Sequence, residues 1–257
     1  MDLPLREGEL IAGKYVVERV LGDGGMGVVV AAQHLELGER VALKFLRPEV
    51  AEIPEARLRF MREARAAARI KGERVARVLD VGTLDDGLPF IVMEHLEGKD
   101  LGRLLETRGP LDVEDAVHYV LQACEAVAHA HAVGIVHRDL KPANLFLATS
   151  ADGSPLVKVL DFGISKCTSV FARTLSPDLT TVNASVGTPG YMSPEQARDA
   201  GNVDVRADVW GLGAVLYELL AGKPAFDGDN VPAIVMMIAT EEPLALETLR
   251  RSRCSER

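Results

Sequence analysis

Cysteine, aromatic residues and long apolar runs are all scarce in this 257-residue sequence. The three cysteines, Cys124, Cys167 and Cys254, are odd in number and lack Cys-x-x-Cys spacing. A disulfide framework or zinc site is therefore disfavoured, and a reducing, cytoplasmic setting is expected. The longest apolar stretch, residues 209–222, is too short to span a bilayer and contains Glu218. The first residues also lack the apolar region of a signal peptide, so we expect no membrane segment in this chain.

Basic residues are fewer than acidic ones, 29 Lys and Arg against 38 Asp and Glu, which gives a formal net charge of -9. This balance argues against nucleic acid as the main partner. Hydrophobic residues make up 47% and charged residues 26% of the chain, as in ordinary soluble globular proteins. The length suffices for one large domain or two small lobes with a buried core.

Short β-rich segments around one helix dominate about the first ninety residues. Strands are predicted at 14–22, 26–35 and 39–46, with glycines joining the first two. An Ala- and Arg-rich helix is predicted from Pro54 to about residue 70. A hairpin follows, in which residues 75–84 and 88–96 flank an Asp-Asp-Gly turn.

Helical periodicity begins at about residue 96. Asp112 is the expected N-cap of a long helix, and Gly134 lies just past its end. The predicted apolar face of this helix, with Cys124 as a small core residue, comprises Val117, Val120, Leu121, Cys124, Val127 and Ala128.

Further elements are predicted toward the C-terminus. Two short strands are expected at 144–149 and 156–162, followed by a Ser- and Thr-rich loop over about 163–187. A second buried helix is predicted over 205–221, with Gly222 as its C-terminal stop signal.

Three glycines, Gly22, Gly24 and Gly27, have G-x-G-x-x-G spacing. The spacing alone is weak evidence, because an ordinary glycine-rich hairpin turn has the same pattern. These glycines lie between two predicted strands, whereas a dinucleotide site needs a strand followed by a helix. A flexible hairpin of this kind can fold over a triphosphate, with backbone N–H groups near the phosphates and no Cβ in the way.

Lys44 lies in the middle of the predicted strand 39–46. A lysine directed inward from a strand needs a counter-charge, because a buried unpaired ammonium is costly. Glu63, on the following helix, is its natural partner. The alternative is an ordinary surface lysine.

The segment HRDLKPAN at residues 137–144 places a carboxylate, an ammonium and an amide on one short loop, through Asp139, Lys141 and Asn144. The segment DFG follows at residues 161–163. Both segments resemble motifs of known phosphoryl-transfer sites.

Five motifs together resemble the catalytic domain of eukaryotic-type (Hanks-type) protein kinases. They are the glycine-rich segment, the strand with Lys44, HRDLKPAN, DFG and GTPGYMSPEQAR. They run in order from Gly22 to about Phe226, and the segments LGDGGMG and GTPGYMSPEQAR are most similar to bacterial serine/threonine kinases. The resemblance implies an α+β fold of two lobes. Residues 1–95 would form an antiparallel-sheet N-lobe with one main helix, and residues 96–257 a mostly helical C-lobe.

The resemblance also implies a non-specific serine/threonine protein kinase that transfers the γ-phosphate of ATP to Ser or Thr hydroxyls of protein substrates. The residues implied to cover the ATP phosphates are Gly22, Gly24 and Gly27. Lys44, held by Glu63, would contact the α- and β-phosphates. Asp161 and Asn144 would hold magnesium, or manganese, beside the phosphates.

Catalytic roles follow from the same resemblance. Asp139 would accept a hydrogen bond from the substrate hydroxyl and orient it, and Lys141 would neutralise the γ-phosphate. Thr188 would hydrogen-bond toward Asp139. The transferred group carries spread negative charge, so cations and positioning supply most of the rate.

The adenine pocket implied by the resemblance is apolar, with Met93 at its gatekeeper position. The residues implied for adenine and ribose are Val29, Ala42, Met93, Glu94, Leu96, Asp100 and Phe146. An ordinary packing role in the core competes with this assignment for the apolar members.

Regulation is implied by Arg138, which in the family reads out phosphate on the activation segment as a bidentate fork. Thr180 and Thr181 are the predicted autophosphorylation sites, and self-association of two chains would allow this reaction. The alternative is a polar loop with incidental hydroxyls.

Supporting roles are expected for several buried residues. Asp208 would hold the backbone of the catalytic loop, and His137 would pack under Phe162. His129 and His131, two apart on a helix, point to different faces, so a metal pair is not expected.

The sequence departs from the family pattern toward its C-terminal end, where we find no match for the final helices of the family or for the arginine expected to pair with Glu195. Leaving a buried carboxylate without its partner costs about 3–5 kcal/mol, against a total stability of about 5–15 kcal/mol. The alternative function is therefore a catalytically weak or inactive kinase-like scaffold or interaction protein.

Overall fold

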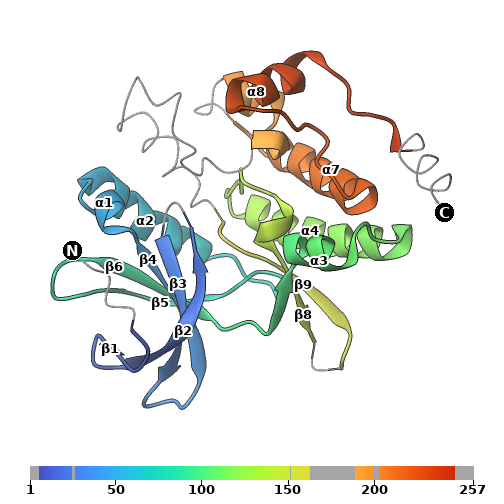
Figure 1. Ribbon diagram of the computed structural model, residues 1–257. Coiled ribbons are helices and arrows are strands. Elements are labelled where there is room, and N and C mark those ends of the chain that lie inside the picture. Colours follow the sequence, from blue (N-terminus) through green and yellow to red (C-terminus); the bar gives the residue numbers. More distant parts are fainter. Residues whose placement is uncertain (1–5, 25–26, 151, 163–188, 199–202, 247–257) are drawn as a thin grey trace. The chain divides into compact units, whose positions relative to one another are not determined.

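The computed structural model describes residues 6–24, 27–150, 152–162, 189–198 and 203–246 (Figure 1). Backbone contacts divide these residues into two compact units. The described part of the first unit lies within residues 6–71 and 76–96. The second unit contains residues 72–75 and the described residues from 97 onward.

A six-stranded antiparallel sheet with the order β1-β2-β3-β4-β6-β5 forms most of the first unit. Its strands are β1 (Leu10–Ile11), β2 (Tyr15–Asp23), β3 (Gly27–His34), β4 (Arg40–Leu46), β5 (Val78–Thr83) and β6 (Pro89–Glu94). Two helices, α1 (Pro48–Ala51) and α2 (Pro54–Ala67), connect β4 to β5. The five strands and the helix expected from the sequence are therefore confirmed, with small differences at their ends.

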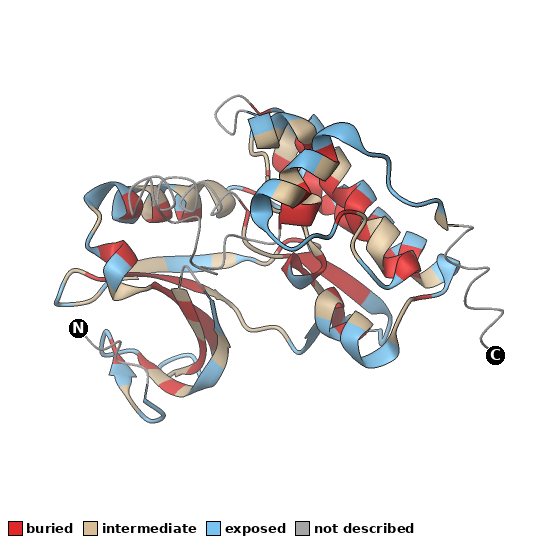
Figure 2. Ribbon diagram, turned by 45° about the horizontal axis from the view of Figure 1, so that its top comes forward, coloured by how far each residue is buried: buried red, intermediate tan, exposed pale blue. Residues whose placement is uncertain are grey.

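One face of α2 shares a core with the sheet. Ala56, Phe60 and Ala64 recur every four residues and are buried, because this spacing places them on the same side of a helix. They belong to the same cluster as Phe45 of β4 and Phe90 of β6, whose ring centroids lie 5.6 Å apart. Figure 2 shows buried positions in red along the strands of the sheet and on the helix.

The second unit is mostly helical and has a three-stranded antiparallel sheet with the order β7-β8-β9. These strands are β7 (Gly98–Asp100), β8 (Leu145–Thr149) and β9 (Pro155–Val159). The helices are α3 (Leu101–Arg108), α4 (Val113–Ala132), α6 (Pro194–Arg198), α7 (Arg206–Ala221) and α8 (Val231–Thr240), with 3₁₀ turns η1 (Pro142–Asn144) and η2 (Pro189–Tyr191). The long helices expected at 113–134 and 205–221 are confirmed as α4 and α7, whereas α3 and α8 were not predicted.

The predicted buried face of α4 is wrong in part. Val120 and Val127 are buried, but the exposed members of the predicted face are Val117, Leu121, Cys124 and Ala128. The residues that α4 buries are mainly small, namely Ala116, Tyr119, Val120, Gln122, Ala123, Ala126, Val127 and Ala130. Alanines let α7 and β9 pack closely against α4, so the large apolar side chains on the other side stay in solvent.

The helix ends behave largely as the sequence predicts. Gly134 and Gly222 follow α4 and α7 with φ of +78° and +75°, in the left-handed region that favours glycine. Asp112 occupies the N-cap position of α4, but its side chain makes no capping hydrogen bond. The caps that do bond belong to the unpredicted helices: Asp100 Oδ1 accepts from Arg103 N at 2.9 Å, and Asn230 caps α8.

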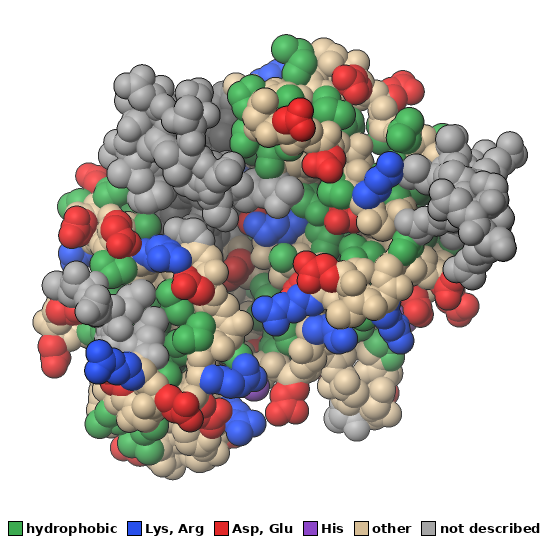
Figure 3. All heavy atoms as spheres, in the orientation of Figure 1, with side chains coloured by type: hydrophobic (Ala, Val, Ile, Leu, Met, Phe, Trp, Pro, Cys, Tyr) green, Lys and Arg blue, Asp and Glu red, His purple; other side chains and the backbone are tan. Residues whose placement is uncertain are grey.

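Basic and acidic side chains are interspersed on the face shown in Figure 3. This mixture accords with the acidic overall composition, and the expectation that nucleic acid is not the main partner stays a prediction. Within the described part of the chain, no helix combines the length and apolarity that crossing a bilayer requires.

Candidate catalytic loop and glycine-rich turn

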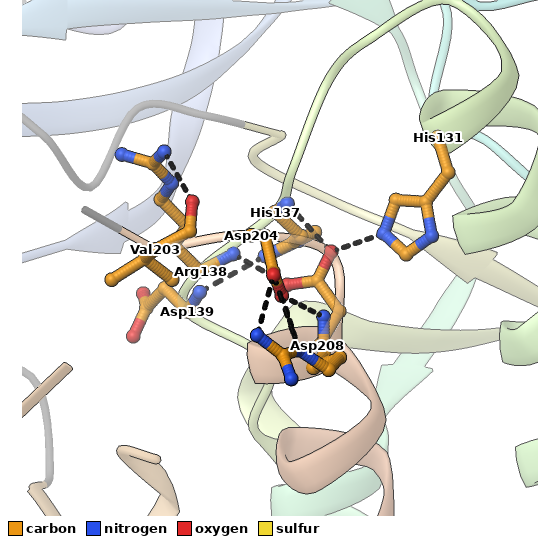
Figure 4. Close-up of polar contacts among 8 residues, drawn as sticks. His131, His137, Arg138, Asp139, Val203, Asp204 and Asp208 are labelled. Atoms are coloured by element: carbon orange, nitrogen blue, oxygen red, sulfur yellow. Dashed lines mark hydrogen bonds and ion pairs between the residues drawn. The ribbon is translucent and has the colours of Figure 1, made fainter. Parts of the chain in front are cut away.

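Asp208, in the first turn of α7, anchors the loop that carries the HRDLKPAN motif (Figure 4). The residue is 1% exposed, and three donors reach its carboxylate. They are the backbone N–H of His137 at 2.8 Å, the backbone N–H of Arg138 at 2.7 Å and Nε2 of His131 at 2.7 Å. A buried carboxylate needs such donors to offset its lost hydration. The prediction that Asp208 holds the backbone of this loop is confirmed.

Gly211 lets the loop approach α7 closely. A Cβ at this position would lie 3.0 Å from the Cβ of Leu140, a loop residue that is itself buried. A side chain larger than hydrogen would therefore push the loop and the helix apart. Asp208 therefore holds the backbone of the loop, and the side chain of Leu140 packs against α7 at Gly211.

Arg138 adopts a left-handed conformation with φ of +68°, which is costly for a residue other than glycine. Three hydrogen bonds fix it there: from its N–H to Asp208, from Nη2 to the Val203 carbonyl at 3.0 Å, and from Gln196 Nε2 to its own carbonyl at 2.8 Å. Its Nη1 is buried and has no hydrogen-bond partner among the described residues. Both N–H groups of Nη1 therefore lack an acceptor within the part of the chain that the structure describes.

His137 is fully buried and has a structural role, as predicted. Its Nδ1 accepts the N–H of Asp139 at 3.2 Å, so Nε2 carries the ring proton and donates to the Leu160 carbonyl at 2.8 Å. The centroids of the His137 and Phe162 rings lie 4.8 Å apart, and the two ring planes form an angle of 61°, which is an edge-on arrangement. The expected packing of His137 on Phe162 is confirmed, and both ring nitrogens are occupied.

Asp139, Lys141 and Asn144 converge on one carboxylate. Asp139 Oδ2 accepts from Lys141 Nζ at 2.8 Å and from Asn144 Nδ2 at 3.1 Å, and Asn144 Nδ2 also donates to the Asp139 carbonyl at 2.6 Å. The Asp139 and Lys141 side chains are 32% and 20% exposed, so they are partly open to solvent. A fixed carboxylate next to a cation can orient a hydroxyl and stabilise negative charge that develops beside it.

The predicted metal ligands have a donor set that suits magnesium. Asn144 uses Nδ2 for Asp139, so its amide oxygen Oδ1 is the atom available to a cation. Leu160 N donates to the Asn144 carbonyl at 2.9 Å, and Asp161 follows directly with φ of +56°. No cluster of three His, Cys, Asp or Glu side chains suited to a metal occurs among the described residues. Magnesium bound through one carboxylate, one amide and substrate phosphates needs no such cluster.

The glycine-rich turn lies in the first unit, between β2 and β3. Gly24 N donates to the Gly27 carbonyl at 3.0 Å and Gly27 N to the Gly24 carbonyl at 3.3 Å, which closes the turn. A Cβ on Gly27 would lie 2.0 Å from the carbonyl oxygen of Phe45 on β4, so only glycine fits there. A Cβ on Gly22 would meet no described atom within 4 Å.

Lys44 is 8% exposed and lies in β4, opposite Val29 of β3 and Ile91 of β6. The alternative of an ordinary surface lysine is therefore wrong. Glu63 lies on α2 in the same unit and is partly buried. The pairing of Lys44 with Glu63 stays a prediction.

The residues expected for adenine and ribose fall into both units. Those in the first unit are Val29, Ala42, Met93, Glu94 and Leu96. Asp100 and Phe146 lie in the second unit, where they are paired partners in β7 and β8. Asp100 also caps α3, which is a structural role that the sequence reading did not foresee.

Two functional neighbours of the catalytic loop were missed. His131 bonds to Asp208, 77 residues away in sequence, and Gln196 bonds to the Arg138 carbonyl. These contacts join residues 77 and 58 positions apart, so the spacing of residues in the sequence does not predict either of them. Thr180, Thr181 and Thr188 lie outside the described residues.

Glu195 is exposed, so the expected cost of an unpaired buried carboxylate does not apply to it. It lines an open hollow of about 590 Å³. The residues around this hollow are Glu195, Asp204, Arg206, Val209 and Trp210. Water reaches the Glu195 carboxylate there, which removes the main energetic ground for an unstable C-terminal region.

The antiparallel sheet with its buried lysine and the helical unit with its anchored HRDLKPAN loop define a protein-kinase-like molecule. The chain belongs to the protein kinase domain family, whose profile matches residues 15–255. This match extends past the last motif recognised in the sequence, near Phe226.

Curated relatives of the chain are bacterial kinases. It is 41% identical over 236 residues to "Serine/threonine-protein kinase pkn3" of Myxococcus xanthus, covering 92% of this chain and 43% of that protein. It is 39% identical over 238 residues to "Serine/threonine-protein kinase PknB" of Mycobacterium tuberculosis, covering 91% of this chain and 36% of that protein. The chain thus spans about two fifths of the length of these relatives.

The fold is shared with a solved kinase domain. The crystal structure of the Mycobacterium tuberculosis PknI kinase domain superposes with a TM-score of 0.72 at 30% identity, covering 96% of this chain and 86% of that one. A double mutant of the same domain gives a TM-score of 0.74 over 98% of this chain. The predicted kinase-like α+β fold is confirmed.

Proposed function

We propose that this chain is the catalytic domain of an ATP- and magnesium-dependent serine/threonine protein kinase. Family membership and identity of about 40% to proteins named as such kinases support the class of reaction. Residues 1–95 and 96–257 are the proposed N-lobe and C-lobe. The finer assignment is a non-specific serine/threonine protein kinase, and Lys141 and the Gly187-Thr188 pair favour protein Ser and Thr hydroxyls over tyrosine as its acceptors.

One observation carries the proposal: Asp139 Oδ2 accepts hydrogen bonds from both Lys141 and Asn144. In the proposed reaction Asp139 orients the substrate hydroxyl and accepts its proton, and Lys141 neutralises the γ-phosphate.

ATP and magnesium are the proposed cofactors. Asp161 and the Oδ1 of Asn144 would hold the metal, which screens the charge of the phosphates. Lys44, with Glu63, would contact the α- and β-phosphates. The glycine-rich turn would cover the phosphates with backbone N–H groups, and the adenine contacts named above complete the proposed nucleotide site.

Arg138 is the proposed sensor of phosphate on the activation segment. Its backbone is fixed by Asp208 and Gln196, and its buried Nη1 has no partner among the described residues. A phosphate on Thr180 or Thr181 would satisfy this donor through a charge-assisted bond. Two copies of the chain would phosphorylate each other. A cytoplasmic setting is proposed because the three cysteines are odd in number and lack Cys-x-x-Cys spacing.

The test is transfer of radiolabelled phosphate from ATP to the chain itself and to a generic basic protein, with and without magnesium. Asp139→Asn should abolish labelling, with a loss of about 10²- to 10⁴-fold expected for a positioned base. Asp152→Asn, an exposed aspartate in the turn between β8 and β9, is the matched control and should label like the wild type.

A wild-type chain that binds ATP with magnesium but transfers no phosphate would support the scaffold alternative instead. Mass spectrometry of the labelled chain should find phosphate on Thr180 or Thr181. An active chain with phosphate on neither residue would contradict the proposed activation step.

A further inference from the structure

Arg47, the residue after β4, reaches the base of the glycine-rich turn. Its Nη2 lies 2.5 Å from Asp23 Oδ1, and its Nε donates to the Gly24 carbonyl at 2.8 Å. The planar guanidinium thus donates to a carboxylate and to a backbone carbonyl of adjacent residues through two nitrogens in a fixed geometry. A lysine has a single nitrogen and could not make both bonds with this geometry. β3 lies between β2 and β4, so this contact connects the ends of two strands that are not neighbours in the sheet.

The backbone of Arg47 is itself fixed. Leu46 before it is 1% exposed and pairs in register with Gly27 at the start of β3. The Arg47 carbonyl accepts the N–H groups of Val50 and Ala51, which are buried on α1. The guanidinium therefore extends from a fixed point of the sheet to the glycine-rich turn.

Asp23 lies between two glycines of that turn, Gly22 and Gly24. If the turn covers phosphates, an unscreened carboxylate there repels them. Arg47 offsets this charge. It also fixes the Gly24 carbonyl, an atom that must point away from any anion bound by the neighbouring N–H groups.

We propose that Arg47 is a positioning residue for the nucleotide: it offsets the charge of Asp23 and holds the Gly24 carbonyl, so that the glycine-rich turn can cover the triphosphate. This inference rests on the proposed kinase function. It assigns to Arg47 an effect on ATP binding and leaves the chemical step to the catalytic loop.

The experiment compares Arg47→Gln with Arg40→Gln, a matched control in the same unit. Arg40 also pairs with a carboxylate of β2, Glu18, at 3.0 Å, but at the other end of β4. Arg47→Gln should raise the KM for ATP about 3- to 6-fold, as for an exposed ion pair, with kcat changed less than about twofold. Arg40→Gln should leave both constants near wild type, and thermal melts of the two variants should coincide.

The double variant Asp23→Asn/Arg47→Gln removes the carboxylate as well, so its KM should fall back toward the wild-type value. Arg47→Lys should rescue only part of the effect, because it keeps the charge without the fork. Affinity for ATP with magnesium is also measured by calorimetry on chains carrying Asp139→Asn, so that binding is followed without phosphate transfer.

The two proposals fail in different ways. Wild-type chain that neither binds ATP nor transfers phosphate overturns the kinase function, and this inference with it. Wild-type chain that does both, with a KM for Arg47→Gln no higher than for Arg40→Gln, overturns the role of Arg47 alone. A double variant with a KM as high as that of Arg47→Gln shows that Arg47 does not act through Asp23, and also overturns the inference.

Discussion

Replacing Asp208 by asparagine should destabilise the catalytic loop while leaving the side-chain shape almost unchanged. The wild-type carboxylate accepts from His137 N and His131 Nε2 through Oδ2 and from Arg138 N through Oδ1. An asparagine has one acceptor oxygen, so its NH2 group must face at least one of these donors.

The magnitude follows from the three bonds. A buried N–H left without an acceptor costs about 1–3 kcal/mol. The remaining two bonds lose the charge of the acceptor, about 1 kcal/mol each from the difference between charged and neutral hydrogen bonds. Asp208→Asn should therefore lower the free energy of unfolding by about 3–5 kcal/mol, and the melting midpoint by roughly 6–20 °C for a domain of this size.

The assay is denaturant unfolding followed by circular dichroism, with Asp204→Asn as the control. Asp204 lies four residues before Asp208, is exposed, and pairs with Arg206 at 2.9 Å (Figure 4). This control should unfold close to wild type, because exposed pairs contribute little. An Asp208→Asn variant as stable as Asp204→Asn would refute the conclusion that this carboxylate anchors the loop.

Three further outcomes are expected. Gly27→Ala should lower the melting midpoint, because its Cβ would lie 2.0 Å from the Phe45 carbonyl oxygen, whereas a variant chain that melts like the wild type would contradict the close β3–β4 approach. Burial raises the pKa of Glu218 above its usual 4.5, against the opposing effect of the hydrogen bond from Tyr191. The folded chain therefore binds this proton more tightly than the unfolded chain. The stability of wild type relative to Glu218→Gln should fall as pH rises from about 4.5 through the folded pKa, then level off; a difference independent of pH would be inconsistent with this. Gln122→Ala should cost about 1–3 kcal/mol in urea titrations, because the buried N–H of Val157 loses its acceptor, and a change within experimental error would rule this out.

The strands and the catalytic loop could be predicted from the sequence because their signals are local. Alternating apolar residues and glycine turns mark β2 to β6, and the HRDLKPAN segment carries its own donors and acceptors. The contact between Asp139 and Asn144 spans only five residues. Such features need little knowledge of the tertiary packing.

The buried face of α4 could not be predicted from apolarity, because close packing selected alanines over larger side chains. Leu121 is 58% exposed, whereas Ala123 and Ala126 are fully buried. Which face of α4 is buried depends on how closely α7 and β9 pack against it, and this cannot be predicted from the sequence of α4 alone.

Long-range polar contacts likewise could not be predicted from the sequence. The hydrogen bond between His131 and Asp208 joins residues 77 positions apart, and the one between Arg47 and Asp23 joins residues 24 positions apart. The exposure of Glu195 depends on which segments cover it, so the penalty expected from its lost partner was wrong. In each case the decisive information was the tertiary arrangement and not the residue type.

The most direct test of the kinase function is phosphate transfer by wild type and Asp139→Asn at matched occupancy of ATP and magnesium. The wild type should place label on serine or threonine of a protein acceptor, and Asp139→Asn should bind ATP equally well while transferring at least about 10²-fold more slowly. Equal transfer by the two chains would contradict the central role given to the Asp139, Lys141 and Asn144 cluster.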